Sequence, residues 1–260
     1  MVDTSKRSQI PVWSSKLLAQ KNVLAFFTTR HGGVSPAPFD TLNLGYSSKD
    51  EPDHVTANRK RVEAAYEVDL RSLAIQVHGS DVLVIQSGEK FPADPLPEAD
   101  AILSNIPGLT IPVFFADCLP IFIWDPIHKA GGVIHAGWRS TVKEVGPLSI
   151  DAMQKSFGSN PKDLLVAFGP SIGPCCFEVG LDVAEQFQKR FGNDAVRRDG
   201  TRTYVDLWKS NQAALLEKGV MGGNMELAGE CTSCRVDRYF SYRRDKTKTG
   251  RMAGVLKIPN

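Results

Sequence analysis

Three residues of the sequence have side chains that could together hold a metal ion: His78, Cys118 and His135. Each stands at the end of an apolar run, beside small residues that allow close approach to the backbone. Two imidazoles and one thiolate suit zinc, and three protein ligands leave a fourth position for water or substrate. Such a zinc would acidify a bound water or polarise a carbonyl or ring nitrogen. The spacing leaves a plainer alternative open, because strand-end histidines and free cysteines are often ordinary core residues.

The composition narrows the class of protein. Among 260 residues, Lys plus Arg number 31 and Asp plus Glu 29, so the overall charge does not point to nucleic acid. The N-terminus lacks a signal-peptide apolar stretch, and no run approaches the length of a membrane span. We therefore expect a cytoplasmic protein with no membrane partner. In that compartment its five cysteines would be reduced and available as ligands, nucleophiles or small hydrophobes.

The elements that must position these residues read as a single α/β domain over residues 21–260, after a short polar N-terminal extension at 1–20. Runs rich in β-branched and aromatic residues predict strands at 23–29, 73–77, 82–86, 101–104, 109–115, 121–124, 132–135 and 164–168. Helices are predicted at 52–66, from 140 or 141 to 157, at 182–191 and from about 206. Hairpin-like strand pairs beside strand-helix alternation favour a mixed β-sheet system with outer helices.

Eight ordered strings resemble the YfiH family, also called the laccase domain-containing or polyphenol oxidase family. The resemblance runs from about residue 23 to the C-terminus. The strings are FTTRHGGVS (27–35), NLGYS (43–47), QVHGSDV (76–82), EADAILSN (98–105), ADCLPIFIWD (116–125), HAGWRST (135–141), FGPSIGPCCFEVG (168–180) and SYRRDKTKTGRMAG (241–254). One departure is Ser140, where many members are expected to have glycine.

The resemblance implies that His78, Cys118 and His135 are the metal ligands, in a single-domain mixed α/β sandwich with outer helices. It also implies a purine nucleoside phosphorylase that acts on purine nucleoside and phosphate, cleaves methylthioadenosine and deaminates adenosine. A zinc-activated water fits deamination directly, whereas the part of zinc in phosphorolysis is less evident. We therefore expect zinc as the cofactor, with copper second.

Phosphorolysis requires cationic groups for the phosphate. Our order of preference for substrate binding is Arg59, Arg30 and Arg139. The alternative for each is a solvated arginine or a fork that holds loop carbonyls. Gln76 could hydrogen-bond substrate, although a buried amide satisfied by backbone is slightly favoured. Asp117, next to the cysteine ligand, could accept a proton, but support of a histidine ligand is the commoner carboxylate role.

Two cysteine pairs lie outside this set. Cys231 and Cys234 form a C-x-x-C, which could be half of a zinc knuckle or a redox pair. Cys175 and Cys176 are adjacent and do not reproduce that spacing, so we expect them to shape a tight loop. The favoured interpretation of Cys231 and Cys234 is small hydrophobic residues near a turn.

Three other functions compete. A copper oxidase of phenols is suggested by the older family label, but laccase chemistry needs paired His-x-His motifs, and this chain has five histidines and no such pair. A cysteine hydrolase would use Cys118 as nucleophile and His135 as base. A factor that edits cell-envelope peptidoglycan through a binding partner is the non-enzymatic alternative, and no sequence feature tests it.

Overall fold

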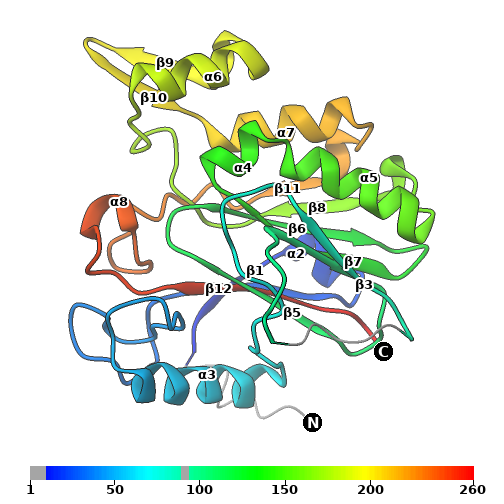
Figure 1. Ribbon diagram of the computed structural model, residues 1–260, viewed down its shortest axis with the longest axis vertical. Helices are drawn as coiled ribbons and strands as arrows, with labels where there is room; N and C mark the ends of the chain where they lie inside the picture. Colours follow the sequence, from blue (N-terminus) through cyan, green and yellow to red (C-terminus); the bar gives the residue numbers. More distant parts are fainter. Residues whose placement is uncertain (1–9, 89–93) are drawn as a thin grey trace.

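The computed structural model describes residues 10–88 and 94–260, in which two β-sheets face each other between outer helices (Figure 1). The first sheet is antiparallel, with the order β1-β2-β12-β5 (Val12–Ser14, Leu24–Thr28, Met252–Lys257, Thr110–Phe115). The second has the order β11-β8-β6-β7-β4-β3 (Met225–Leu227, Leu165–Phe168, Leu119–Asp125, Ala130–Ala136, Ala101–Ser104, Val82–Ile85). Its outer pairs β11-β8 and β3-β4 are parallel and its inner pairs antiparallel, so the predicted mixed sandwich is confirmed.

Strand β6 lies at the centre of the second sheet, and all seven of its residues are buried. Side chains alternate along a strand, so Phe122 and Trp124 belong to the core between the sheets, whereas Ile121 and Ile123 belong to the core under the helices. A strand covered on both faces is apolar throughout. This explains why the run LPIFIW shows no alternation of polar residues.

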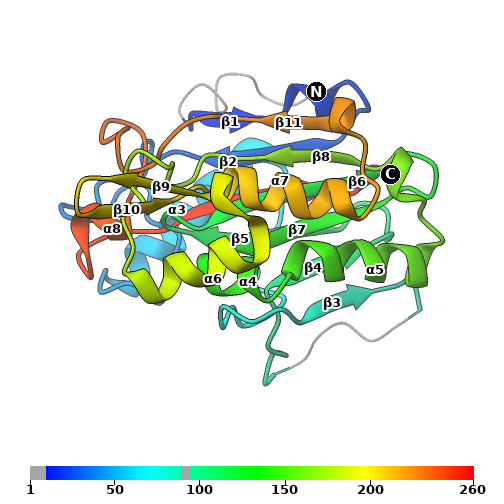
Figure 2. The same ribbon diagram turned by 90° about the horizontal axis from the view of Figure 1, so that it is seen from above.

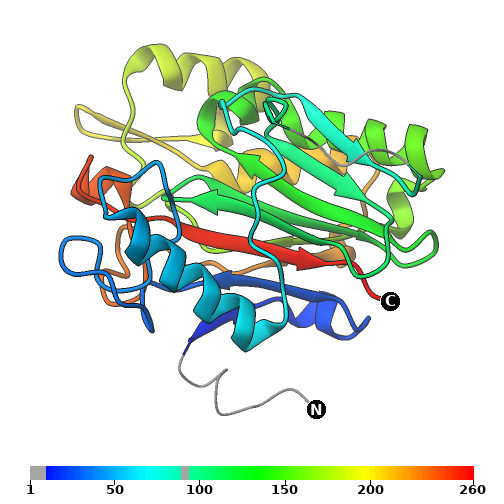
Figure 3. The same cartoon turned by 60° about the horizontal axis from the view of Figure 1, so that its bottom comes forward.

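Helices cover both outer faces of the sandwich (Figures 1 and 3). Helix α3 (Pro52–Tyr66) covers the first sheet, where Tyr66 stacks on Phe26 of β2 at 4.5 Å between ring centroids. Helices α4, α5 and α7 (Trp138–Val142, Val145–Phe157, Leu207–Glu217) lie over the second sheet. Short helices α2 and α8 span Lys16–Ala19 and Tyr242–Asp245, and 3-10 turns span Pro161–Asp163, Asn193–Ala195 and Gly222–Asn224.

A smaller lobe projects at one end of the sandwich (Figure 2). It consists of helix α6 (Leu181–Phe191) and the hairpin β9-β10 (Val196–Asp199, Arg202–Val205). Phe187 of α6 and Phe177 of the adjoining loop are buried in one apolar cluster that also includes Leu207 of α7. The loop at 169–180 joins this lobe to the end of β8.

Several predicted elements need correction. The helix at 52–66 is confirmed. The predicted strand at 73–77 forms only an isolated bridge, Ile75 to Glu98. The predicted helix at 140–157 is two helices, since Glu144 adopts a left-handed φ of 64° between α4 and α5. Strand β12 was not predicted, although it joins β2 to β5.

The predicted boundary near residue 20 does not coincide with an edge of the fold. Strand β1 pairs with β2, Leu18 is fully buried, and the Ser15 hydroxyl donates to Glu226. The predicted extension at 1–20 therefore belongs to the sandwich from residue 10 onward, and residues 1–9 lie outside the described ranges. None of the described helices has the length and apolar character needed to cross a membrane.

Candidate active site

The three predicted metal ligands come together at one end of the second sheet. Their ligand atoms lie within 4.8 Å of one another. His135 lies near the end of β7, and Pro120 pairs with it across the sheet, so Cys118, just before β6, is brought beside it. His78 is on the loop before β3, with a left-handed φ of 57°.

Asp100 organises two of these ligands, although the sequence analysis did not single it out. Its Oδ1 accepts hydrogen bonds from Nδ1 of His135 (2.7 Å) and the backbone N–H of His78 (3.0 Å). Its Oδ2 accepts from the amides of Gly79 and Val77. With Nδ1 of His135 engaged, Nε2 is left to face Cys118 and His78 as a ligand.

Charge favours a thiolate at this position. Burial opposes ionisation of Cys118, but the charge and hydrogen bond of His135, and then those of His78, outweigh it and lower the pKa of the thiol to about 6. Burial likewise opposes protonation of His135, yet Cys118 and Asp100 raise its pKa to about 9. In the absence of metal, the pair is therefore a thiolate beside an imidazolium. A metal cation could replace the proton on the imidazolium of His135.

The donor set fits zinc. Cys118 Sγ lies 3.8 Å from Nε2 of His78, close to the roughly 3.6 Å expected across a tetrahedral zinc site. Gly137 explains how the ligands approach so closely. A Cβ atom there would lie 2.9 Å from Cys118 Sγ and 3.1 Å from Cδ2 of His78.

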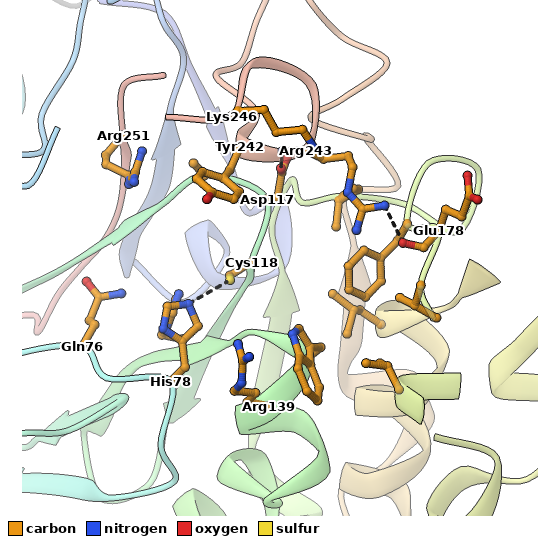
Figure 4. Close-up of a pocket in the computed structure, with 18 of the residues that line it drawn as sticks. Gln76, His78, Asp117, Cys118, Arg139, Glu178, Tyr242, Arg243, Lys246 and Arg251 are labelled. Atoms are coloured by element: carbon orange, nitrogen blue, oxygen red, sulfur yellow. Dashed lines mark hydrogen bonds between the residues drawn. The ribbon is translucent and has the colours of Figure 1, made fainter. Parts of the chain in front are cut away.

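A cavity of about 730 Å³ opens beside these ligands (Figure 4). Aromatic side chains form part of its walls, namely Phe114, Trp138, Phe177 and Tyr242. Four cationic side chains also line it: Arg139, Arg243, Lys246 and Arg251. The cavity can therefore receive a flat aromatic molecule together with an anion.

Two of the four cations are already engaged, and two have no partner among the described residues. Arg243 donates to the Glu178 carbonyl, and Arg251 donates to two neighbouring carbonyls. Among the described residues, the side chains of Arg139 and Lys246 have no hydrogen-bond or ion-pair partner, and Arg139 lies over the Trp138 ring at 4.4 Å. Figure 4 shows Arg139 and Lys246 on opposite sides of the cavity, so each offers unused donors to an anion on its own side.

The structure separates the three predicted arginines. Arg139 lines the cavity, whereas Arg30 and Arg59 do not. Arg59 is buried and donates to the carbonyls of Leu44 and Leu70. Arg30 donates to the Asp40 carbonyl and pairs with the Asp40 carboxylate at 3.1 Å. For these two, the geometry favours the alternative role of holding loop carbonyls.

Gln76 and Asp117 line the cavity but are engaged elsewhere. The Gln76 amide donates to the Phe114 carbonyl (2.9 Å) and accepts from its N–H (3.0 Å), which matches the favoured alternative of a backbone-satisfied amide. The Asp117 carboxylate accepts from Thr232, Ser241 and the backbone of Arg243. Asp117 thus ties the turn before β6 to two later loops. The support of a histidine ligand that was expected of Asp117 is provided by Asp100 instead.

The segment from Tyr242 to Arg251 supplies most of the cationic lining, and the sequence analysis left its role open. The run SYRRDKTKTGRMAG carried a usable signal, since it concentrates basic residues within one resembled string. Which of those side chains face the cavity depends on helix α8 and the following turn. Arg244, for example, instead donates to the carbonyls of Thr232 and Ser233.

A two-sheet sandwich with a His-Cys-His group at one end of its central strands fits the laccase-domain class of protein. A family model described as multi-copper polyphenol oxidoreductase laccase matches residues 24–259, so the chain belongs to that family. The chain is 38% identical to purine nucleoside phosphorylase YfiH of Escherichia coli, over 95% of this chain and 97% of that protein. It is 32% identical to purine nucleoside phosphorylase YlmD of Bacillus subtilis, over 97% and 95%.

Solved structures share the fold. YlmD from Geobacillus stearothermophilus superposes with a TM-score of 0.87 at 30% identity, covering 95% of this chain and 94% of that one. A Bacillus licheniformis protein titled YfiH gives 0.85 at 32% identity, covering 91% and 93%. The resemblance inferred from the eight strings is thereby confirmed.

Proposed function

We propose that this protein is a zinc-dependent purine nucleoside phosphorylase, which cleaves adenosine, inosine and methylthioadenosine with phosphate, and also deaminates adenosine. The observation that carries the proposal is one shared cavity, in which the open group of His78, Cys118 and His135 faces the unpartnered cations Arg139 and Lys246. The names of the relatives support the phosphorylase activity.

In phosphorolysis, the glycosidic C–N bond breaks, a phosphate oxygen bonds to C1′ of the sugar, and the base departs with a proton. Arg139 and Lys246 would hold the phosphate through charge-assisted hydrogen bonds. Trp138, Phe177 and Tyr242 would bind the purine through their ring faces. Fixing both partners in one cavity removes much of the entropic cost of their encounter.

A zinc ion held by His78, Cys118 and His135 would supply Lewis acidity, and a more acidic water for deamination. The chain contributes the geometry of the site. Asp100 holds His135 in the ligating tautomer and fixes the backbone of His78. Gly137 leaves the space that the ligands require.

The test is incubation of the protein with adenosine and with inosine, each with and without phosphate, followed by chromatography. Free base that appears only with phosphate supports the phosphorylase, and inosine formed from adenosine supports the deaminase. His78→Ala should abolish both products, whereas the matched variant His128→Ala, whose ring pairs with Asp125 outside the cavity, should not. If the purified protein forms neither product, the proposal fails.

A cysteine hydrolase is the second candidate, because the lowered pKa of Cys118 beside a protonated His135 also suits a nucleophile. Zinc at this thiolate would prevent attack. Metal analysis of protein purified without added metal, together with alkylation of Cys118, distinguishes the two. Rapid alkylation of Cys118 in protein that holds no zinc would support the hydrolase and contradict the proposed zinc enzyme.

A multicopper oxidase is poorly supported by the histidines. His54 and His128 pair with Asp50 and Asp125, and the ring of His31 contacts the Asp237 carbonyl. All five histidines lie in the described residues, and only His78 and His135 join a possible metal group there. A trinuclear copper cluster requires many more imidazoles than this group holds.

A further inference from the structure

A second group of metal-ligating side chains lies away from the cavity's histidines. It comprises the four remaining cysteines of the chain, here termed the four-cysteine cluster: Cys175, Cys176, Cys231 and Cys234. The adjacent pair was not expected to match the C-x-x-C. Nevertheless, all four Sγ atoms lie within 4.8 Å of one another.

The sheet topology explains this meeting of two distant segments. Strands β8 and β11 are parallel neighbours, paired through Phe168 and Leu227, and lie side by side in Figure 2. The chain leaves both strands in the same direction, and a further bridge joins Ser171 to Cys231. Each segment then turns, so that its two cysteines face those of the other segment.

The sulfur positions suit a tetrahedral metal site. Sγ of Cys234 lies 3.3 Å from Sγ of Cys176 and 3.5 Å from Sγ of Cys175. The edge of a tetrahedral zinc tetrathiolate is about 3.8 Å, given zinc–sulfur bonds of about 2.3 Å. A disulfide would require about 2.05 Å, and all four cysteines are free. The four sulfur atoms are therefore close enough to bind one metal ion, and no disulfide joins them.

The surroundings also favour ligands over core residues. Cys175 and Cys234 are exposed, so the interpretation of the C-x-x-C as small hydrophobic residues does not fit Cys234. The Gly173 amide donates to Sγ of Cys231 at 3.2 Å, as backbone amides do to negatively charged acceptors. A Cβ atom at Gly173 would lie 2.8 Å from the Trp208 ring, so the loop can pack this closely against Trp208 only with glycine at position 173.

Two arginines hold the loops that carry the cysteines. Arg197 donates to the carbonyl of Pro174, next to Cys175. Arg244 donates to the carbonyls of Thr232 and Ser233, between the two cysteines of the C-x-x-C. Both guanidinium groups also pair with carboxylates, Arg197 with Asp199 and Arg244 with Asp245, so they fix the backbone of the cysteine loops and add no net charge to the cluster.

We propose that the four-cysteine cluster binds one zinc ion as a closed, structural tetrathiolate site. Each thiol releases its proton to solvent as its sulfur bonds to the metal. With all four positions taken by protein, the ion has no place for substrate. The site is distinct from the open group at His78, Cys118 and His135, and does not depend on the proposed enzymatic function.

The site would stabilise one wall of the cavity. Phe177 and Glu178, which line the cavity, follow Cys176 directly. On the other segment, Thr232 donates to the buried carboxylate of Asp117 at 2.6 Å. A zinc ion would therefore fasten the Phe177 loop to the segment that positions Asp117.

The test is zinc analysis of the purified full-length protein, with single variants at each site. Wild type should hold two zinc ions per chain. Cys234→Ser should lose one of them, as should Cys118→Ser at the other site, whereas Ser233→Ala should retain both. Because Cys234 is exposed, its substitution should not prevent folding, and Cys175→Ser serves as a second variant of the same kind.

Cobalt substitution identifies the ligands. Cobalt-loaded Cys118→Ser should retain strong sulfur-to-cobalt charge-transfer absorption from the four thiolates, and cobalt-loaded Cys234→Ser should lose most of it. One zinc per chain that disappears in Cys118→Ser alone would overturn the proposal. So would thiols that become reactive on reduction and not on chelation, since that result identifies a disulfide, or iron in place of zinc.

Discussion

Oδ1 of Asp100 accepts a 2.7 Å hydrogen bond from Nδ1 of His135, and the same oxygen accepts from the backbone of His78. One buried carboxylate thus connects two of the proposed metal ligands, which are far apart in sequence. Burial opposes its ionisation, yet the hydrogen bond and charge of His135, followed by the amides of Gly79 and Val77, lower the pKa of Asp100 below its usual range. Asp100 therefore stays ionised and holds both ligands in place.

Asp100→Asn should weaken zinc binding and activity by about 10- to 100-fold, because an amide holds the His135 tautomer less well than a carboxylate. Competition with a metal-binding dye measures the zinc affinity. Asp81→Asn is the matched control, since Asp81 is exposed and contributes its backbone carbonyl to this region. Equal zinc affinity in wild type and Asp100→Asn would contradict the assigned role.

Alkylation of Cys118 in zinc-free protein should have a midpoint near pH 6, because the thiolate is the reactive form and the pKa of Cys118 is about 6. Labelling is therefore fast above this pH and slows as the pH falls through it. His135→Gln should move the midpoint upward, since it removes the largest stabilising influence on the thiolate. Mass spectrometry of iodoacetamide-treated protein measures the rate.

His128→Gln is the control for that experiment, because His128 pairs with Asp125 on another turn. Its midpoint should remain that of wild type. A midpoint near the ordinary thiol value of about 8.5 in the unmodified chain would refute the thiolate–imidazolium pair.

Gly137→Ala should disrupt the metal site with little change elsewhere in the fold. The added Cβ would lie 2.9 Å from Cys118 Sγ and 3.1 Å from the His78 ring, so at least one ligand must move. We expect a zinc affinity reduced by about 10- to 100-fold, similar to the loss of a ligand-orienting partner. Gly223→Ala, where no atom lies within 4 Å of the added Cβ, should bind zinc normally. If Gly137→Ala and Gly223→Ala held similar amounts of zinc, Cys118 and His78 would not lie as close to position 137 as these distances indicate.

The meeting of His78, Cys118 and His135 in one group could be predicted because their chemistry is rare in the chain, whereas the carboxylate that supports them could not. His78 and His135 are two of only five histidines, and both lie in strings typical of the family. Asp100 is one of many acidic residues, and its role appears only when the β4 and β7 strands pair beside the His78 loop. Long-range hydrogen bonds of this kind leave no local pattern in a sequence.

The same limit applies to the cationic residues and to the cysteines. Arg59 and Arg139 both lie in or beside segments with helix-like patterns. Arg59 is on the buried face of α3, whereas Arg139 faces the cavity. Cys175 and Cys234 are separated by 59 positions, and the parallel pairing of β8 with β11 brings them together. A periodic pattern predicts an element, while the neighbours of each side chain depend on the order of strands.

Lys246→Gln should raise the KM for phosphate about tenfold or more, with a smaller effect on the KM for nucleoside. Its ammonium group has no partner among the described residues, so its charge is available to an anion in the cavity. A charge-assisted hydrogen bond contributes about 1.5–3 kcal/mol, which corresponds to roughly 10- to 150-fold in affinity. Lys248→Gln is the matched control, because Lys248 is exposed and does not line the cavity.

Saturation curves at varied phosphate measure the effect. If the two lysine variants share the wild-type KM for phosphate, Lys246 does not bind the anion. Arg139→Gln provides a second, independent variant on the opposite side of the cavity (Figure 4).

Arg59→Met should destabilise the fold without changing the KM for phosphate. Its guanidinium group donates to two buried carbonyls and lies over the rings of Tyr46 and Phe114 at 4.3 Å each. Each carbonyl left without a donor costs about 1–3 kcal/mol, so the unfolding midpoint in urea should fall clearly. Arg139→Met should show the opposite pattern, with near wild-type stability and a raised KM, because Arg139 is exposed and, among the described residues, donates to no carbonyl. Comparable KM values in the two variants would mean that phosphate is held elsewhere, and a stable Arg59→Met would mean that the two loop carbonyls find other donors.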